Sequence, residues 1–428
     1  MSTIRDLSGC GQPLPEVDLK PLLARLWPLG HAQPVSAEEL AQAISYFFTN
    51  QVSDVQAGAL LMCLHFTGLD RQADVLAVTA AAMLKAAAKI DGAALKAIVE
   101  LRRRKEGAYE GGLCDIVGTG GDSHNTFNIS TTSSILASSL LLISKHGNKA
   151  STSKSGSADL LNCMLPRAPQ ISRVRPDTIA EVYSKTNYAF LFAPVFHPGM
   201  KHVAPIRKQL PWRTVFNLVG PLANPVDLTS PTDGGTSLLE ARVIGVARKD
   251  LGPVFASALR MSGAQKAMVV CGDEELDEIS CAGPTLCWRL LPDAASHPKG
   301  PAAAVEHFIL TPDDFGLPSH PLSEVSPGKE PTENAAILTR ILNNELPADH
   351  PILHFVLINT AALFVVSGIC EADTSDMGHG DDGAVIKERG PGGGRWKDGV
   401  RRARWAITSG EAARQWANFV DVTNSFSE

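Results

Sequence analysis

The sequence contains no pair of cysteines in the Cys-x-x-Cys arrangement. Its eight cysteines, at positions 10, 63, 114, 163, 271, 281, 287 and 370, are scattered along 428 residues. This distribution disfavours a zinc cluster or a disulfide framework and fits a reducing compartment. The first twenty residues also lack the apolar stretch of a secretory signal. We therefore expect a cytoplasmic protein.

Positive charge and aromatic side chains are also in short supply. Lys and Arg number 39 against 45 for Asp and Glu, which gives a formal charge of -6. Proteins that bind the nucleic-acid backbone usually carry the opposite balance, so this composition disfavours a nucleic-acid partner. Aromatic residues make up only 6% of the chain, which favours closely packed helices over an aromatic-rich β sandwich.

Long hydrophobic runs are interrupted. The longest apolar stretch, residues 352–369, contains His354, Asn359 and Thr360. Polar groups within a membrane-spanning helix are costly, so we interpret this stretch as a buried core helix. We expect no membrane partner.

The first hundred residues have the pattern of packed helices. Ser36 with Glu39, and Ser53 with Gln56, have the spacing of a capping box ahead of apolar residues. Asp70 is expected to begin an alanine-rich helix that reaches about Ile90. The pattern predicts an all-helical N-terminal domain over residues 1–105, mainly 36–90.

From residue 106 onward, short apolar runs bounded by glycine alternate with helical stretches. This alternation is typical of βαβ units and predicts a larger α/β domain over residues 106–428, with a mostly parallel central sheet and ligands at the strand ends. The expected strands are Leu113–Val117, Leu140–Ser144, Ala189–Phe192, Ala241–Val246 and Ala267–Cys271. Two terminal helices are expected at Asp398–Thr408 and Glu411–Val422, and surface insertions near 229–237, 297–330 and 374–395.

Two loops that follow predicted strands have the composition of phosphate-binding loops. Gly118-Thr-Gly-Gly-Asp122 lets backbone N–H groups approach an anion, ahead of a helix that begins near Ser130. Lys145-His-Gly-Asn-Lys-Ala-Ser-Thr-Ser153 supplies lysine, amides and hydroxyls ahead of a helix near Ser157. Either loop alone is compatible with a plain turn or a solvated basic loop. Together they predict a ligand with more than one phosphate group.

Two further segments carry candidate site residues. Residues 192–225 combine prolines and glycines with apolar residues, as expected for a pocket lining, and include His197 and Arg207. A histidine in such a place is more often structural than a base. The acid pairs Asp273–Glu274 and Asp277–Glu278 follow a predicted strand, and carboxylates with no histidine or cysteine partner suit Mg²⁺. The alternative is a solvated acidic turn.

Together, these segments resemble the anthranilate phosphoribosyltransferases of tryptophan biosynthesis. The residues that carry the resemblance are Gly118–Asp122, Asn128–Thr131, Lys145–Asn148, Ser153–Asp159, His197–Arg207, Gly220–Pro221 and Leu276–Ser280. The resemblance implies a small helical domain beside a larger α/β domain, as in the pyrimidine nucleoside phosphorylases, and a homodimer. It also implies transfer of the phosphoribosyl group of 5-phosphoribosyl-1-pyrophosphate (PRPP) to the amino group of anthranilate, with Mg²⁺ as cofactor.

The resemblance also implies roles for matching residues. Magnesium would be held by Ser130, Asp277 and Glu278, in preference to Asp273–Glu274. Anthranilate would contact Gly118, Asn148, His197, Arg207, Gly220 and Pro221. PRPP would contact Gly118, Gly121, Asp122, Thr126, Asn128, Ile129, Ser130, Thr131, Lys145, His146, Gly147, Asn148, Lys149, Ala150, Ser151, Thr152, Ser153 and Ser157. The expected catalytic residues are Lys145, Arg207, Asp277 and Glu278.

Two other functions compete with this interpretation. A pyrimidine nucleoside phosphorylase of the same fold needs no acidic metal pair, so Asp277–Glu278 and Asn128–Thr131 count against it. A non-catalytic homologue that binds nucleic acid should have a basic surface and lost site residues, whereas this chain is acidic and keeps the whole set. We therefore predict an enzyme that acts on small molecules.

Overall fold

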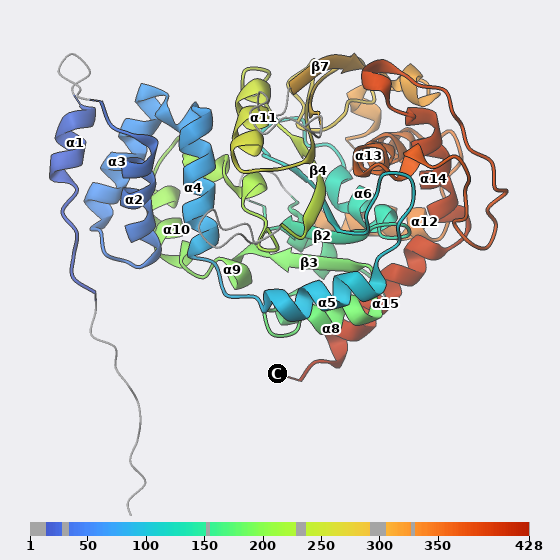
Figure 1. The fold of residues 1–428 in the computed structure, drawn as a ribbon, viewed down its shortest axis with the longest axis horizontal. Helices are drawn as coiled ribbons and strands as arrows, with labels where there is room; N and C mark the ends of the chain where they lie inside the picture. Colours follow the sequence, from blue (N-terminus) through green and yellow to red (C-terminus); the bar gives the residue numbers. More distant parts are fainter. Residues whose placement is uncertain are drawn as a thin grey trace, which may run out of the picture.

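The computed structural model describes residues 14–27, 34–150, 155–227, 237–291, 305–326 and 330–427. A group of helices lies beside a larger α/β body, and the central sheet belongs to that body (Figure 1). The N-terminal helices are α1 (Lys20–Leu26), α2 (Ala37–Phe48), α3 (Asp54–Thr67) and α4 (Ala73–Lys85). Helix α10 (Met200–Lys208), which follows β3 in the sequence, packs on α2 and α3. We call α1–α4 and α10 the helical group.

Side-chain caps begin two of these helices, with one difference from expectation. The Ser36–Glu39 capping box is confirmed, since the Glu39 N–H donates to Ser36 Oγ at 3.2 Å and the Ser36 N–H donates to Glu39 Oε2 at 3.0 Å. Ser53 accepts from the Gln56 N–H, but the Gln56 side chain accepts instead from the N–H of Leu19. The expected second capping box is therefore wrong in one of its two hydrogen bonds. The Leu19 N–H, just before α1, occupies the Gln56 side-chain oxygen that would have accepted from the Ser53 N–H.

The expected start of α4 at Asp70 is also wrong. Asp70 lies in a 3-10 turn (Leu69–Arg71) and α4 runs from Ala73 to Lys85. The Asp70 carboxylate is buried and lies 3.5 Å from both His65 Nδ1 and Arg71 Nε. Because its side chain faces these partners, it does not cap the helix that follows.

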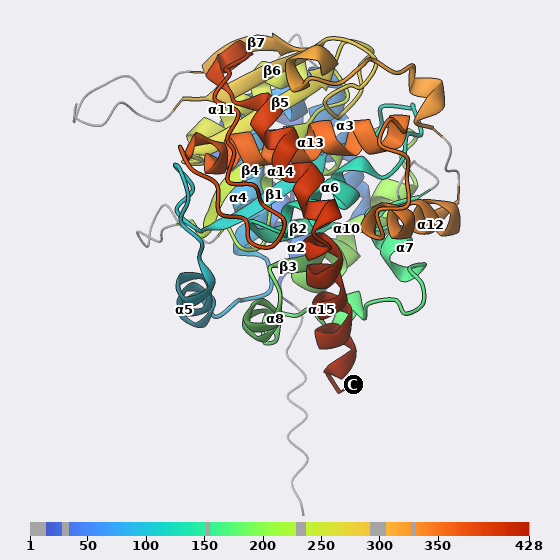
Figure 2. The same cartoon turned by 90° about the vertical axis from the view of Figure 1, so that its right-hand side faces the viewer.

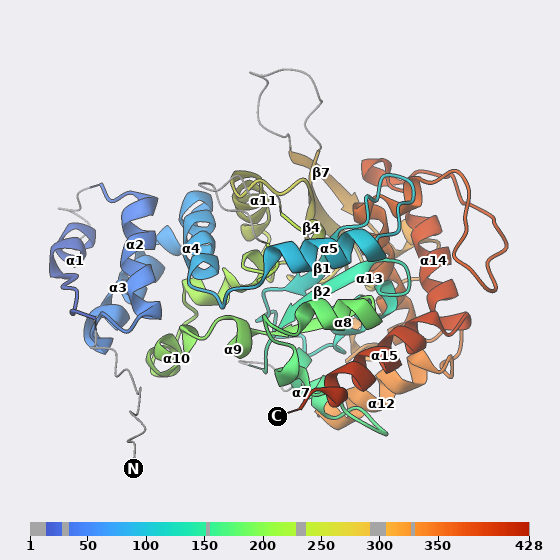
Figure 3. The ribbon, with the colours of Figure 1, turned by 60° about the horizontal axis from the view of Figure 1, so that its bottom comes forward.

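Helix α5 (Gly92–Arg102) leaves the helical group and packs on α8 (Ile179–Lys185), at the α/β body (Figure 3). Its apolar residues Leu95 and Val99 belong to the core of that body. Helix α5 is therefore not part of the helical group, which consists of α1–α4 and, from a separate segment of chain, α10.

One seven-stranded sheet has the order β3-β2-β1-β4-β5-β6-β7. Figure 2 shows the strands following one another from β7 at the top to β3 at the bottom. Strands β1 to β5 are parallel, while β6 and β7 are antiparallel to their neighbours. Their bounds are β1 Leu113–Gly118, β2 Leu142–Gly147, β3 Tyr188–Phe192, β4 Leu239–Gly245, β5 Lys266–Gly272, β6 Thr285–Leu290 and β7 Val305–Leu310.

The five expected strands are the five parallel strands, and only β2 has a bound that differs by more than two residues, since it starts two residues later and ends three residues later than expected. Residues 140 and 141 donate their N–H groups to Ala137 O at the end of α6 (Ile129–Ala137), so they close that helix. The strand begins at Leu142, whose N–H donates to Tyr109 Oη at 3.1 Å. Strands β6 and β7 were not predicted from the sequence.

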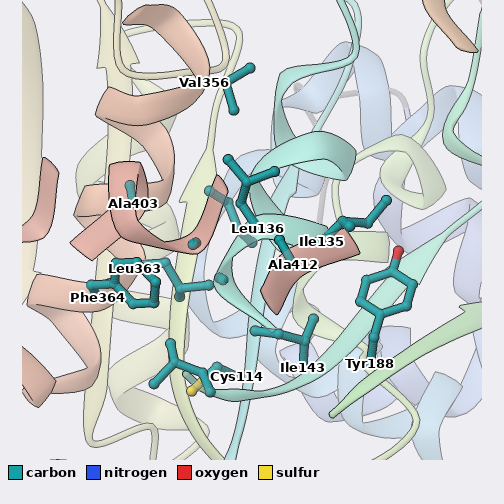
Figure 4. Close-up of a cluster of buried hydrophobic side chains, with 14 of the residues drawn as sticks. Cys114, Ile135, Leu136, Ile143, Tyr188, Val356, Leu363, Phe364, Ala403 and Ala412 are labelled. Atoms are coloured by element: carbon teal, nitrogen blue, oxygen red, sulfur yellow. The ribbon is translucent and has the colours of Figure 1, made fainter. Parts of the chain in front are cut away.

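Helices cover both faces of the sheet. On one face, α6, α13 (Pro351–Ser367), α14 (Trp396–Thr408) and α15 (Glu411–Ser425) pack on β1 to β5 and on one another. Figure 4 shows this core, with Cys114, Ile143 and Tyr188 of the sheet facing side chains of these helices. On the other face, β4 and β5 share a second core with the helical group and α11 (Leu251–Met261). The remaining α-helices of the described residues are α7 (Ser157–Asn162), α9 (Ala193–Phe196) and α12 (Pro331–Leu342).

Helix α13 confirms the expected core helix. Every residue from Ile352 to Ser367 is buried. Within the described ranges, no helix is long and apolar enough to cross a membrane. The two expected terminal helices are confirmed as α14 and α15, which begin or end up to three residues beyond the expected bounds.

The expected insertions fall partly outside the described residues. Residues 228–236, 292–304 and 327–329 are not described, which covers nearly all of 229–237 and the first part of 297–330. The described part of 305–326 forms β7 and two 3-10 turns. Residues 374–395 run irregularly over the surface, where the Asp381 carboxylate accepts from the Met377 N–H and from Ser375 Oγ at 2.8 Å each.

Candidate active site

The candidate site lies at the carboxyl ends of the central parallel strands. A cavity of about 380 Å³ opens there between the α/β body and the helical group. It is lined by Met83 of α4, by the ends of β1 and β2, by α9 and α10, and by the segment that follows α10. All of the residues expected to contact anthranilate line this one cavity, namely Gly118, Asn148, His197, Arg207, Gly220 and Pro221.

The glycine loop after β1 is held tightly between two side chains. Gly120 and Gly121 have φ values of +65° and +85°, a left-handed conformation that strongly favours glycine. The Gly120 N–H donates to Asp277 Oδ2 at 2.6 Å, and a Cβ at Gly118 would collide with the same carboxylate. On the other side, a Cβ at Gly121 would collide with the Arg213 guanidinium. The glycines are therefore needed for close contact with Asp277 and Arg213.

The second acidic pair points into this site. Asp277 is buried and Glu278 is largely buried, in the turn between β5 and β6. Asn359 of α13 anchors this turn, because it accepts from the Ile279 N–H and donates to the Ile279 carbonyl, both at 3.0 Å. Helix α13 thus holds the turn that carries Asp277 and Glu278 in place.

Burial and neighbouring negative charges perturb the pKa values of both carboxylates. Burial and the charge of Asp122 raise the pKa of Asp277 to about 7, against the opposing hydrogen bond from Gly120. Burial and the charge of Asp277 raise the pKa of Glu278 well above its usual range, while the Ser130 backbone N–H and Lys145 oppose that rise. The structure therefore brings Ser130, Asp277 and Glu278 together, as expected for the metal set.

The first acidic pair is occupied elsewhere. Asp273 pairs with Lys249 at 2.6 Å on the surface, and Glu274 Oε1 accepts from Ser280 Oγ. These partners already compensate the two carboxylates. The geometry thus agrees with the preference for Asp277–Glu278.

Lys145 is the buried cation of the site. Its side chain is 1% exposed and its ammonium donates to the His146 carbonyl at 3.3 Å. Burial lowers the pKa of Lys145, while Asp115, Glu278 and Asp277 oppose that change. Burial in turn raises the pKa of Asp115, which accepts from Asn224 Nδ2 at 2.8 Å. One ammonium therefore faces several carboxylates.

This donor set fits a magnesium ion. Carboxylate oxygens are the preferred ligands of Mg²⁺, and burial raises the pKa values of Asp277 and Glu278, so a bound cation would favour their charged forms. Within the part of the chain that is described, no three acidic, histidine or cysteine side chains are placed to hold an ion alone. Mg²⁺ is commonly held by one or two carboxylates together with water and substrate phosphates. The arrangement suits an ion that binds together with a phosphorylated ligand.

The loop after β2 is joined to the starts of α6 and α7. Thr131 Oγ1 donates to Ser157 Oγ at 2.8 Å, and Asn128 Nδ2 donates to the Ser155 carbonyl at 3.1 Å. Asp159 of α7 accepts from the N–H groups of Ala150 and Gly156 at 2.7 and 3.1 Å. The expected residues Asn128, Thr131, Ala150 and Ser157 are thus connected, as a shared phosphate site requires.

Some expected PRPP residues are placed differently. Ser151, Thr152 and Ser153 lie outside the described residues. The Ile129 side chain is buried in the core, so it faces away from any ligand. Thr126 is partly exposed on the loop before α6.

Two histidines meet at the wall of the cavity. The rings of His146 and His197 lie 5.1 Å apart, with His146 Nδ1 3.2 Å from the Gly220 carbonyl and His197 Nε2 3.1 Å from the Ala223 carbonyl. Burial and the neighbouring His197 hold the pKa of His146 well below its usual range. Burial lowers the pKa of His197 to about 4. Both rings are neutral near pH 7, each with its hydrogen on the nitrogen that faces a carbonyl.

Arg207 supplies the positive charge of the cavity. It comes from α10, and its guanidinium lies 5.9 Å from the centre of the Phe216 ring. Burial and the nearby Arg213 lower the pKa of Arg207. None of the ion pairs among the described residues involves Arg207. An anionic group is therefore the natural partner for it.

The sequence reading missed several residues of this site. Arg213 donates to the carbonyls of Gly120 and Thr119 at 2.6 and 2.9 Å, and Asn224 joins Asp115 to the Ser144 carbonyl. Met83 enters from the helical group. Arg213 lies within residues 192–225, whose composition predicts a pocket lining, and this is the feature of the sequence that points to it.

Comparison with known proteins identifies the family. The chain matches the glycosyl transferase family, a/b domain, over residues 110–413, and the helical bundle domain of that family over residues 20–87. The anthranilate phosphoribosyltransferase of Schizosaccharomyces pombe is 40% identical over 396 residues, which is 92% of this chain and 94% of that protein. The chain belongs to the anthranilate phosphoribosyltransferases.

Solved structures agree with this assignment. The anthranilate phosphoribosyltransferase of Saccharomyces cerevisiae in complex with PRPP and Mg is 30% identical, with a TM-score of 0.75 over 95% of this chain and 98% of that one. The same enzyme in complex with 4-fluoroanthranilate has a TM-score of 0.73 at 28% identity, with the same coverage of both chains. The predicted fold class, a helical domain beside an α/β domain with a mostly parallel sheet, is confirmed for this chain.

Proposed function

We propose that this chain transfers the phosphoribosyl group of PRPP to the amino group of anthranilate, releasing pyrophosphate. The observation that supports this most directly is the 380 Å³ cavity, because it gathers every residue expected for anthranilate. The glycine loop and the acidic pair adjoin it. The yeast complexes with PRPP and Mg, and with 4-fluoroanthranilate, support the same assignment.

In this proposal, PRPP lies across the two loops after β1 and β2. Backbone N–H groups of the glycine loop, the start of α6 and the Lys145–Ala150 loop would bind its phosphates. The N–H groups of Gly121 and Asp122 have no hydrogen-bond partner within the described residues, so they are available to an anion. Ser157 and Thr131 would complete the set from the starts of α7 and α6.

Asp277, Glu278 and Ser130 would hold Mg²⁺. When bound, Mg²⁺ offsets negative charge that grows on the departing pyrophosphate. Lys145 contributes a second positive charge from beneath the loops, where its 1% exposure keeps water away from it. The carboxylates in turn hold the glycine loop through the Asp277–Gly120 hydrogen bond.

Arg207 would orient anthranilate. Its planar guanidinium can bind both oxygens of a carboxylate, and no ion pair of the described residues engages it. The aromatic amine is already neutral near pH 7 and the sugar carbon becomes cationic, so positioning contributes more than base catalysis. His146 Nε2 is buried and has no partner within the described residues, so it can accept the proton that the amine loses after attack.

We further propose a cytoplasmic homodimer as the working form. Val55, Met62 and Phe66 are exposed along one side of α3, with 81%, 41% and 58% of each residue accessible. Their spacing of seven and four residues places them on one helical face, and such an apolar stripe is well suited to contact with a second copy. This face belongs to α3, within the helical group (Figure 1).

We retain residues 1–105 and 106–428 as the proposed domain division. The match of the helical bundle model to 20–87 and of the a/b model to 110–413 supports a boundary between residues 87 and 110. Helix α5 lies in this interval and connects the two parts.

The proposed reaction is tested by the fluorescence of anthranilate. Purified protein is mixed with anthranilate, PRPP and Mg²⁺, and each component is omitted in turn. We expect the fluorescence to fall only in the complete mixture, which establishes the reaction and its metal requirement together. A folded protein that gives no fall would contradict the proposal, and phosphorolysis of pyrimidine nucleosides would be measured next.

A further inference from the structure

Arg213 connects two parts of the molecule that are far apart in sequence. It follows α10, in the segment that runs from the helical group towards β4. Its guanidinium donates to Gly120 O at 2.6 Å, to Thr119 O at 2.9 Å and to Asn217 O at 3.4 Å. All three acceptors are backbone carbonyls, and two of them belong to the glycine loop.

The glycine loop is fixed on its other sides as well. The Thr119 N–H donates to Gly245 O at 2.9 Å, and Thr119 Oγ1 accepts from the Ala247 N–H at 3.2 Å, both at the end of β4. The Gly120 N–H donates to Asp277. Arg213 supplies the remaining side, and the left-handed glycines at 120 and 121 are what bring the loop against it. Loss of the guanidinium would leave two loop carbonyls without their partner.

The helical group holds Arg213 in turn. The preceding residue, Trp212, stacks on His65 of α3 with ring centres 6.1 Å apart. It also meets Phe66 edge to face at 5.2 Å. The backbone of residue 213 is therefore anchored to α3, while its side chain reaches the α/β body.

We propose that Arg213 is a positioning residue for phosphoribosyl transfer. It sets the shape of the glycine loop from the helical group, so that the loop's free N–H groups meet the phosphates of PRPP. Arginine suits this task because its rigid fork can bond two carbonyls at once, which a lysine ammonium on a flexible stem does not reproduce. The proposal rests on the proposed function, since it assigns the loop to PRPP.

Two variants separate position from charge. Arg213→Lys keeps the positive charge beside Asp277 and Asp122 but loses the fork, and Arg213→Ala loses both. We expect KM for PRPP to rise about tenfold or more in both variants, with KM for anthranilate changed about twofold at most. Titration calorimetry of PRPP binding should show the same loss. Guanidinium ions at millimolar concentration should partly restore the alanine variant.

The control is Arg248→Ala. Arg248 lines the same small cavity of about 100 Å³ beside the loop, but its side chain is half exposed and, within the described part of the chain, pairs only with Asp250. This variant should keep the wild-type constants. A lysine variant with the wild-type KM for PRPP would overturn the proposal, because charge alone would then suffice. An equal rise in KM for PRPP and for anthranilate, together with a lower Tm, would also overturn the proposal. An inactive wild-type protein would instead contradict the proposed reaction.

Discussion

The strands of the sheet end in two different arrangements of buried charge. Near their amino ends, Glu240 accepts from the N–H groups of Glu110 and Gly112 at 2.8 and 2.6 Å and pairs with Lys266. Asp227 and Arg242 pair there at 2.6 Å, each 4% exposed. At the carboxyl ends, Asp277 and Glu278 face one another, and their pKa values are raised.

The difference separates structural charge from charge that awaits a ligand. The cavity at the amino ends is about 680 Å³, larger than the 380 Å³ of the candidate site. Its buried carboxylates have cations and N–H groups within bonding distance, so nothing in it calls for an ion or a phosphate. Within the described residues, buried carboxylates without an ion-pair partner therefore mark the site better than the size of a cavity does.

The largest expected effect comes from neutralising Asp277 and Glu278. Asp277→Asn combined with Glu278→Gln should lower turnover about a thousandfold at ordinary Mg²⁺, because no charged oxygen then remains at these positions to hold the ion. The rate is measured by the loss of anthranilate fluorescence over a range of Mg²⁺ concentrations.

The first acidic pair provides the matched control. Asp273→Asn combined with Glu274→Gln makes the same chemical change at carboxylates that already have partners, and should keep the Mg²⁺ dependence of the wild type. Unchanged rates in the 277/278 variant would move the metal elsewhere, and loss in the 273/274 variant would point to that pair.

At the amino ends of the strands, removing a charge should lower the stability of the fold. Arg242→Met leaves Asp227 buried without its cation and should lower the free energy of unfolding by about 3 kcal/mol. The folded fraction should keep the wild-type kcat/KM, because the pair is far from the strand ends that bear the site. Urea denaturation and the fluorescence assay measure the two quantities. Recovery of stability on adding Asp227→Leu would support the cause, and a loss of kcat/KM without a loss of stability would contradict it.

The pH dependence of stability sharpens the comparison further. Asp277 has a pKa of about 7 in the folded chain, above its ordinary value near 4. The folded state thus favours the protonated acid, and the resulting stability is full below pH 4 and is lost as pH rises towards 7. Without ligands, Asp277→Asn should therefore be about 2 kcal/mol more stable than the wild type at pH 8, with a smaller difference at pH 5. Denaturation curves that differ equally at both values would contradict this.

The smallest effect distinguishes the two arginines. Arg207, unlike Arg242, has no acidic partner among the residues that the structure describes, so Arg207→Ala should change Tm little but raise KM for anthranilate about tenfold. PRPP affinity, measured by titration calorimetry, should stay within about twofold of the wild type. Lys208→Ala removes an exposed cation from the same helix and serves as control. Equal loss of affinity for both substrates would contradict a role confined to anthranilate.

The main fold could be predicted because its signals are local. The parallel strands are short apolar runs bounded by glycine, and α13 is apolar on every side, so each is visible within ten to twenty residues. Strand β7 has alternating exposed and partly buried residues, and lies at the edge of the sheet, so no such run marks it. Asp70 misled because an aspartate before a helix usually caps it, and here a tertiary contact with His65 and Arg71 prevails.

The site divides in the same way. The two loops and the acidic pair are contiguous motifs, and the structure brings them together as expected. Arg213 binds the glycine loop across 93 positions, and Asn359 fixes the acidic turn across 80. Both bond to backbone groups, which every residue possesses, so no residue type at the partner position announces the contact. Such residues become visible only in three dimensions.

Helix α13 has a consequence for how the chain is made. Its buried surface rests on strands that precede it and on α14, which follows it, with α15 packed against α14 (Figure 4). During synthesis, the sheet can therefore assemble while one side of this largely apolar helix is still uncovered, until residues 396–425 leave the ribosome. We expect chains that stop before α14 to be removed by proteases or to aggregate, and a tag at the carboxyl terminus to report complete chains.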